Sequence, residues 1–171
     1  MSLAMFASPM FAQSRHLNAA LCMVRNLPTE VPANLNALSI ESHMFISGPN
    51  STAELRVRNV SPKSIIAIEL LLEYYGSNGE RFGDVIADAI ARQIPDERAF
   101  PILKRMKGGG AAEITDVISP GGTASVRGLG LFATAICPVR ARLTAARLWF
   151  SDGASLDWSA PDSRLILNPM N

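Results

Sequence analysis

Aromatic residues and net charge are both scarce in this sequence. Phenylalanine, tryptophan and tyrosine together make up 6% of the 171 residues, and the formal net charge is only +1. A surface that stacks bases needs a local concentration of aromatic rings, and one that binds phosphates needs an excess of basic residues. We therefore expect no nucleic-acid partner.

Cysteine and histidine are also rare, with two of each. Cys22 and Cys137 lie far apart and form no Cys-x-x-Cys or Cys/His pattern with the spacing of a metal site. In an exported protein the two could form a disulfide; otherwise they are two unrelated small apolar residues, and the spacing leaves both possibilities open. We expect no cofactor and no metal site.

The sequence holds no recognisable catalytic set. His16 lies in the N-terminal segment, whereas His43 lies in a predicted strand with Glu41 two positions away. Ser39 and Ser42 are the nearest hydroxyls, but neither lies in the sharp turn that presents a nucleophilic serine. We interpret His43 as a surface or partly hydrogen-bonded strand histidine and expect His43→Ala to leave folding nearly intact. We predict no catalytic residues and no enzymatic activity.

The N-terminal segment indicates export. Its apolar stretch from Leu3 to Ala12 precedes Gln13 in a way that resembles the end of a secretory signal, although no basic residues come before it. We favour a signal-peptide remnant over a loose apolar tail, because an exposed apolar tail is a liability on a soluble domain. We expect residues 1–35 to be this remnant and a poorly ordered segment, and the protein to be secreted or periplasmic. No later run is long enough for a transmembrane helix.

What the sequence does contain is a series of short strand patterns. Residues 54–58, for example, alternate between charged and apolar side chains, as expected for a strand with one face in water. Gly128 and Gly130 weaken another strand and indicate a bulge or a sheet edge. About seven strands are predicted, at 38–46, 54–60, 65–75, 112–117, 123–131, 140–150 and 154–158. Residues 36–171 are therefore predicted to form one all-β domain, an antiparallel two-sheet immunoglobulin-like sandwich.

The clearest signal is the hairpin of residues 140–158. A three-residue loop, Ser151–Gly153, keeps one face apolar, whereas a two-residue loop would place Leu148 opposite Asp157. Gly153 then adopts the left-handed conformation. Trp149 is predicted on the face opposite Leu148, where it covers the second face of the sheet, marks an interface or, as we favour, packs under residues 80–110. The predicted pairs are Phe150 with Ala154, Leu148 with Leu156, and Ala146 with Trp158.

Residues 80–110 interrupt the strand pattern and are expected to form a partly helical insertion. Apolar residues between positions 85 and 94 have helical spacing, and Asp84 could cap the helix. Asp84 and Asp88 would share one face, where capping and solvation are favoured over a cation site. We interpret the basic run Lys104–Lys107 as a solvated surface and Gly108–Gly110 as flexible chain.

Three segments together resemble a known group of proteins. They are Arg56–Lys63, Pro120–Gly122 and Leu148–Gly153, with a long apolar strand after the first. This arrangement resembles bacterial exported domains of the immunoglobulin-like or fibronectin type III-like β-sandwich kind, many without an assigned function, over about residues 38–160. The resemblance implies an exported, non-enzymatic module and supplies no catalytic residues.

These observations lead to two hypotheses about function. The first is an exported binding or structural module that contacts a protein or a cell-envelope component through its sheet edges or the 80–110 insertion. The alternative is a small-ligand or metal-binding envelope protein, which needs polar groups that converge in a pocket.

Overall fold

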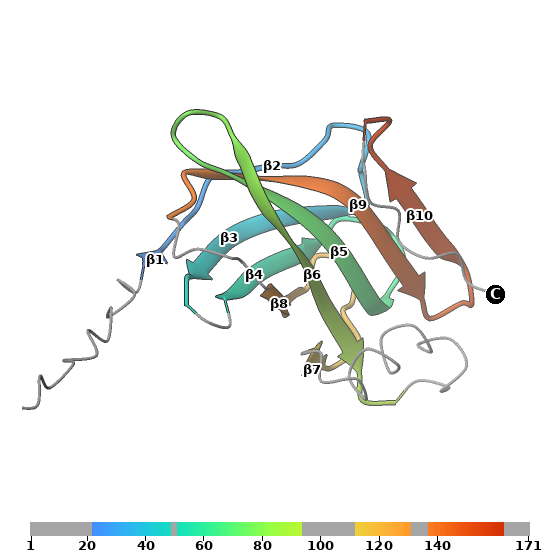
Figure 1. Cartoon of the computed structure of the whole chain (residues 1–171). Helices are drawn as coiled ribbons and strands as arrows, with labels where there is room; N and C mark the ends of the chain where they lie inside the picture. Colours follow the sequence, from blue (N-terminus) through green and yellow to red (C-terminus); the bar gives the residue numbers. More distant parts are fainter. Residues whose placement is uncertain (1–21, 49–50, 94–111, 131–136, 163–171) are drawn as a thin grey trace, which may run out of the picture.

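The computed structural model describes residues 22–48, 51–93, 112–130 and 137–162. These residues form ten strands and no helix (Figure 1). In chain order the strands are β1 (Met23–Val24), β2 (Thr29–Glu30), β3 (Leu38–Ile46), β4 (Ser51–Asn59), β5 (Ile65–Tyr75), β6 (Arg81–Ala91), β7 (Ala112–Thr115), β8 (Thr123–Gly130), β9 (Arg140–Phe150) and β10 (Ser155–Ser159). All seven predicted strands are present, with small differences at their ends.

The strands belong to a single sheet that curls strongly into a half-barrel (Figure 1). Their order is β1-β3-β4-β8-β6-β5-β9-β10, while β2 pairs with β9 and β7 with β6. These last two pairings are parallel and the others are antiparallel. The all-β prediction is confirmed, but the predicted antiparallel two-sheet sandwich was wrong.

A short pairing between β8 and β6 makes the sheet continuous. Ile86 lies opposite Leu129 and Ala87 opposite Gly128. A Cβ atom on Gly128 would lie only 2.5 Å from the carbonyl oxygen of Ile86, so the close approach of the two strands requires glycine here. The sequence therefore indicated a special position correctly, but Gly128 lies in an interior strand and not at a sheet edge.

The main hydrophobic core lies inside the curl. Phe45 of β3 and Tyr74 of β5 have ring centroids 4.8 Å apart, although three other strands separate β3 from β5 in the sheet. Contact between such distant strands is possible because the sheet folds over onto itself. Leu27 and Leu35 pack into the same core, so part of the segment that we expected to be poorly ordered contributes to it.

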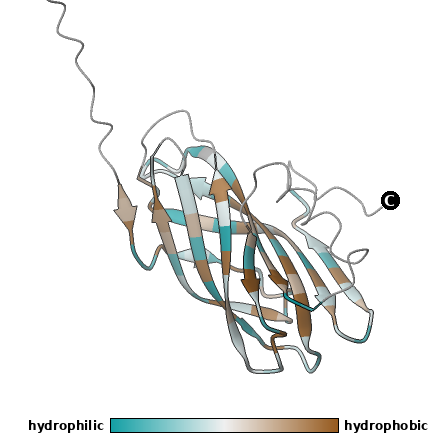
Figure 2. Ribbon diagram, turned by 90° about the horizontal axis from the view of Figure 1, so that it is seen from below, coloured by the Kyte–Doolittle hydropathy of each residue, from teal (hydrophilic) through white to brown (hydrophobic). Residues whose placement is uncertain are grey.

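Strand β6 replaces the predicted helix. Val85, Ala87 and Ala89 of this strand are buried in the main core, whereas Ile90 belongs to a second apolar cluster. Figure 2 shows polar and apolar residues alternating along several strands of the sheet. The partly helical insertion was therefore wrong for residues 81–91, and residues 94–111 lie outside the described part of the chain.

Cys22 and Cys137 form a disulfide. Cys22 lies directly before β1 and Cys137 shortly before β9, and the disulfide closes a loop with a sequence separation of 115. The carbonyl of Cys22 also accepts a hydrogen bond from the Ser47 N–H at 2.7 Å. The N-terminal end of the described chain is therefore attached to the sheet both covalently and by main-chain bonding.

Candidate functional site

The β9–β10 hairpin has the predicted register. Leu148 lies opposite Leu156 and Ala146 opposite Trp158. The Phe150 N–H donates to the carbonyl of Ala154 at 2.9 Å, which completes the third predicted pair. Gly153 has a φ of 90°, as the three-residue loop requires.

This register determines which main-chain groups of β10 face away from β9. In an antiparallel ladder, alternate residues direct both their N–H and their C=O toward the neighbouring strand. The Ala154 carbonyl accepts from Phe150 and the Ala160 N–H donates to Thr144, so both residues bond to β9. Every second residue between them, Leu156 and Trp158, therefore bonds to β9 as well. Ser155, Asp157 and Ser159 therefore direct their N–H and C=O groups toward the outer edge.

No other described strand pairs with that edge, because β10 is the last strand of the sheet. The side chains of Ser155, Asp157 and Ser159 are exposed as well. An unpaired row of N–H and C=O groups is a template for another strand. The edge of β10 is therefore suited to main-chain recognition by another extended chain.

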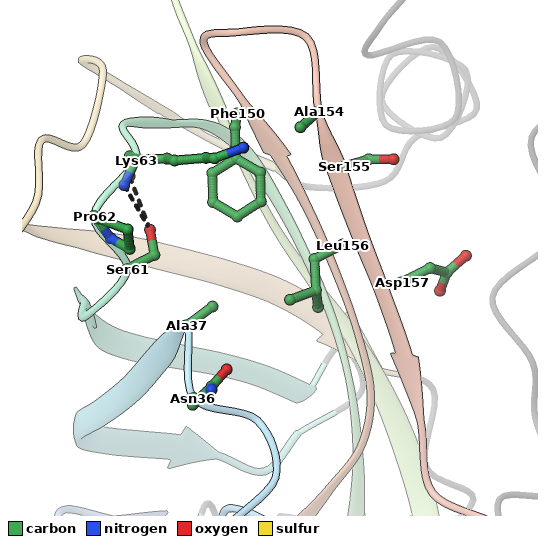
Figure 3. Close-up of a pocket in the computed structure, with 10 residues that line it drawn as sticks. All are labelled: Asn36, Ala37, Ser61, Pro62, Lys63, Phe150, Ala154, Ser155, Leu156 and Asp157. Carbon is green, nitrogen blue, oxygen red and sulfur yellow. Dashed lines mark hydrogen bonds between the residues drawn. The ribbon is translucent and has the colours of Figure 1, made fainter.

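A groove of about 540 Å³ runs beside this edge (Figure 3). One wall is the beginning of β10. The opposite side is formed by Asn36 and Ala37, which precede β3, and by the loop between β4 and β5. The complete lining is Asn36, Ala37, Ser61, Pro62, Lys63, Phe150, Ala154, Ser155, Leu156 and Asp157.

The side chains around the groove point in two directions. Figure 3 shows Leu156 pointing into the groove toward Ala37, with the Phe150 ring above it. The side chains of Ser155 and Asp157 point away on the other side of the strand. These two residues thus present mainly backbone to the groove, in agreement with the register, while Leu156 and Phe150 provide an apolar surface.

A well-bonded loop positions Lys63 at the end of the groove nearest the hairpin turn. The buried Asn59 amide donates to the carbonyls of Lys63 and Ile118, at 2.8 Å and 2.9 Å. Its oxygen accepts from the N–H and the hydroxyl of Ser61, at 3.0 Å and 2.7 Å. Because every polar atom of this amide is used, the loop backbone is fixed although the Lys63 side chain is about half exposed.

The Lys63 ammonium retains unused bonding capacity. Its Nζ lies 2.8 Å from an Asp152 carboxylate oxygen and 5.8 Å from the centroid of the Phe150 ring. The bond from Lys63, together with one from the Ala154 N–H, lowers the pKa of Asp152. An ammonium has three donors, and an ion pair between exposed groups is weak. Lys63 can therefore turn toward a second anion in the groove.

Asp157 carries a negative charge at the outer face of the same edge. Its Oδ2 accepts from Arg147 Nε and Nη2 at 3.2 Å and 2.9 Å, and its side chain is 60% exposed. Within the described residues Oδ1 has no hydrogen-bond donor. Arg147 is only 1% exposed and also lies 3.8 Å from Glu69. The Asp157 carboxylate is thus fixed in place with one oxygen available.

Trp149 lies on the face opposite Leu148, as predicted. It packs with Ile66, Ala67, Ile90 and Ala91 in the second apolar cluster. Trp149 was also predicted to pack under residues 80–110. Ile90 and Ala91, in the same cluster, belong to the described part of that range, whereas residues 94–111 are not among those described. The Lys104–Lys107 run and Gly108–Gly110 lie outside the described residues too.

For His43 the expected surface position was wrong, whereas the alternative, a hydrogen-bonded strand histidine, was right. His43 is 1% exposed inside the curl, where Nδ1 lies 2.7 Å from Thr29 Oγ1 and Nε2 lies 2.9 Å from the Tyr74 hydroxyl. The Thr29 hydroxyl donates its only proton to the carbonyl of Leu27 at 3.0 Å. Nδ1 must therefore carry the proton given to Thr29, and Nε2 accepts from Tyr74.

This hydrogen-bond chain is structural in character. Burial lowers the pKa of His43 to about 4 and raises that of Tyr74. A neutral histidine with both ring nitrogens bonded has no free base to offer a substrate. Its partners Thr29 and Tyr74 belong to β2 and β5. These hydrogen bonds therefore connect the N-terminal segment to the interior of the curled sheet.

Asp84 and Asp88 lie on strand β6 and not on a helix, so the capping prediction was wrong. Asp84 lies opposite Glu73 and Asp88 opposite Glu69. Asp84 Oδ2 accepts from Arg81 at 2.6 Å, and burial raises the pKa of Asp84. Asp88 is buried, which contradicts the predicted solvated face. No group of three or more metal-ligating side chains occurs within the described ranges.

Sequence reasoning proposed sheet edges in general terms but did not locate the groove. Its register prediction already implied that Ser155 and Asp157 face outward from β9. The opposite wall could not be predicted, because Asn36, Lys63 and Leu156 are far apart in the chain. Only the curl of the sheet brings them together.

Comparisons with protein-family models, with curated proteins and with solved structures found no match to this chain. Thus no match supports the immunoglobulin-like or fibronectin type III-like resemblance. The described residues also include no helix that is long and apolar enough to cross a membrane.

Proposed function

We propose that the protein is an exported, non-enzymatic binding module that takes up an extended segment of a partner protein as an additional strand beside β10. One observation carries this proposal: the N–H and C=O groups of Ser155, Asp157 and Ser159 face outward beside an apolar groove, and no described strand pairs with them. In strand addition, main-chain bonds supply affinity and pockets for alternate side chains supply specificity.

A small ligand is the alternative occupant, and the volume of about 540 Å³ would suit one. We favour a strand because two of the lining residues, Ser155 and Asp157, direct their main-chain N–H and C=O groups toward the outer edge beside the groove. The spacing of these groups along an extended strand matches that of another extended chain.

Export is supported by two independent features. The Cys22–Cys137 disulfide is typical of proteins that fold in an oxidising compartment. The apolar sequence up to Ala12 resembles the end of a secretory signal. The partner is therefore expected among secreted, periplasmic or envelope proteins.

The experiment uses random heptapeptides displayed on phage and selected on the purified protein. Peptides that are enriched are then measured against Ser155→Pro and its matched control Ser155→Ala. Proline removes the outward N–H of residue 155 without removing a bond to β9, because that N–H faces away from β9. We expect Ser155→Pro to weaken binding at least about tenfold and Ser155→Ala to leave it unchanged.

Ser159→Pro, with Ser159→Ala as control, repeats the test at the other end of the strand. An unchanged denaturation midpoint establishes that each variant folds. Failure to enrich any peptide, or equal binding by folded proline and alanine variants at both positions, would overturn the proposal.

A further inference from the structure

The charged groups beside β10 favour a partner segment with a particular order of residues. This inference rests on the proposed strand addition. We infer that the added strand is antiparallel to β10 and that its residues, in order, are apolar, basic, apolar, neutral and acidic. The positions follow from the register of β10 and from the two charged groups at the groove, Asp157 and Lys63.

The direction follows from the ladder. Antiparallel pairing gives hydrogen bonds perpendicular to the strands and is somewhat more stable per residue than parallel pairing. β10 begins at Ser155, close to Lys63. An antiparallel partner therefore runs with its C-terminal end toward Lys63.

The apolar positions face Trp158 and Leu156. In neighbouring strands, side chains of opposite residues lie on the same face of the sheet. Leu156 points into the groove, and both Leu156 and Trp158 pack partly against the main core. A partner side chain opposite Leu156 consequently enters the groove, where Ala37 and Phe150 are apolar neighbours. One opposite Trp158 lies on the same face of the sheet, beside the indole ring.

The basic position lies between them and faces Asp157. Its side chain lies on the outer face, beside the Asp157 oxygen that has no donor among the described residues. A carboxylate directly opposite would be repelled, whereas an ammonium or guanidinium can bond to it.

The acidic position faces Ala154 and lies on the groove side. Lys63 and Ala154 both line this end of the groove. Among the described residues the Lys63 ammonium forms an ion pair with the exposed Asp152 carboxylate alone, so a carboxylate of the partner can reach it. The amide of Asn36 on the opposite wall forms no side-chain bond within the described part of the chain and can bond to the partner as well.

A second copy of β10 does not fit this pattern. If two β10 edges paired, Asp157 of one molecule would face an outward residue of the other, which is Ser155, Asp157 or Ser159. None of them supplies a cation, and the central register places two Asp157 carboxylates directly opposite one another. We therefore assign the edge to a segment of a different protein.

The test uses the acetylated and amidated peptide Thr-Val-Lys-Val-Thr-Glu-Thr. Three comparison peptides replace its Glu with Lys, replace its Lys with Glu, or reverse its whole order. Affinities are measured by titration calorimetry on the full chain and on Lys63→Gln, with Arg127→Gln as the control, because Arg127 is an exposed cation on β8, away from the groove.

We expect the first peptide to bind best and Lys63→Gln to weaken it a few-fold, with no change for Arg127→Gln. The variant Lys63→Glu should reverse the preference, so that the peptide with Lys in place of Glu binds better. Equal affinities for all four peptides, or the same losses in both glutamine variants, would overturn the inference.

The failure of this inference can be distinguished from the failure of strand addition. If peptides bind without regard to charge but Ser155→Pro still abolishes binding, strand addition holds and the charge pattern is wrong. If Ser155→Pro has no effect on peptide affinity, strand addition itself fails. Self-association at the β10 edge would favour a second copy and contradict the inference.

Discussion

His43 is held neutral in the folded protein by its burial. The pKa of its imidazole falls from 6.5 to about 4. Below pH 6.5 the unfolded chain binds a proton at His43, whereas the folded chain does so only near pH 4. Stability is therefore complete above pH 6.5 and is lost as the pH falls toward 4.

We expect this loss to reach about 3 kcal/mol, at about 1.4 kcal/mol per pH unit. The measurement is denaturant unfolding between about pH 7 and pH 4 for the wild type and for His43→Gln, which keeps a donor and an acceptor but does not titrate. Comparing the two removes the opposite contribution of Asp84, whose pKa is raised. Equal pH dependence in both proteins would contradict the assignment.

The burial of His43 could not be predicted from its local sequence. The residues just before His43 in β3, Glu41 and Ser42, are polar, which favoured a surface position. Its partners, Thr29 and Tyr74, lie 14 and 31 residues away. Whether such a residue is a surface group or part of a buried network depends on which strands the fold brings together.

At the scale of the elements, strand β8 depends on Gly128 for its contact with β6. Gly128→Ala would place a Cβ atom against Val85 and the Ile86 carbonyl. We expect a loss of about 1–3 kcal/mol in the free energy of unfolding. Ser125→Ala, at a half-buried position on the same strand, is the control and should change little. A Gly128→Ala variant as stable as the wild type would show that β8 and β6 are not closely packed.

The β9–β10 turn depends on Gly153 in a different way. Its φ of 90° is unfavourable for any residue with a Cβ atom, most of all for a β-branched one. Gly153→Val should lower stability by about 1–3 kcal/mol, and Gly153→Asn by less, because asparagine tolerates the left-handed region better. Identical denaturation midpoints for the valine and asparagine variants would contradict this turn geometry.

Strand boundaries were more predictable than strand neighbours. Alternation of charged and apolar residues located β4, because its two faces differ. The clear turn at Ser151–Gly153 located β9 and β10. Strand β6 was mistaken for a helix because apolar side chains occur on both of its faces. Val85, Ile86, Ala89 and Ile90 consequently have a helix-like spacing. Sequence periodicity cannot separate these two cases.

For the molecule as a whole, the disulfide supplies a long-range constraint. Cys22 and Cys137 close a loop with a sequence separation of 115. Removing such a cross-link gives the unfolded chain more conformational freedom and typically lowers the free energy of unfolding by about 2–5 kcal/mol. We expect a reducing agent to lower the denaturation midpoint of the wild type and to leave that of the double variant Cys22→Ser/Cys137→Ser unchanged. A wild-type midpoint that does not respond to the reductant would contradict the disulfide.

The sheet architecture was the main feature that the sequence could not reveal. The two-residue pairing of β8 with β6 decides between two separate sheets and one curled sheet. It depends on Gly128, which sequence reasoning could identify only as an unusual strand position. The groove between β10 and Asn36 is a consequence of that curl and was inaccessible for the same reason.

The most direct test of strand addition is amide hydrogen exchange along β10, residue by residue, with and without the peptide Thr-Val-Lys-Val-Thr-Glu-Thr. In the free protein the amides of Leu156 and Trp158 should be protected, while those of Ser155, Asp157 and Ser159 exchange rapidly. We predict that the bound peptide slows exchange at these three alternate amides. Exchange that is unchanged at Ser155, Asp157 and Ser159 when the peptide is bound would contradict it.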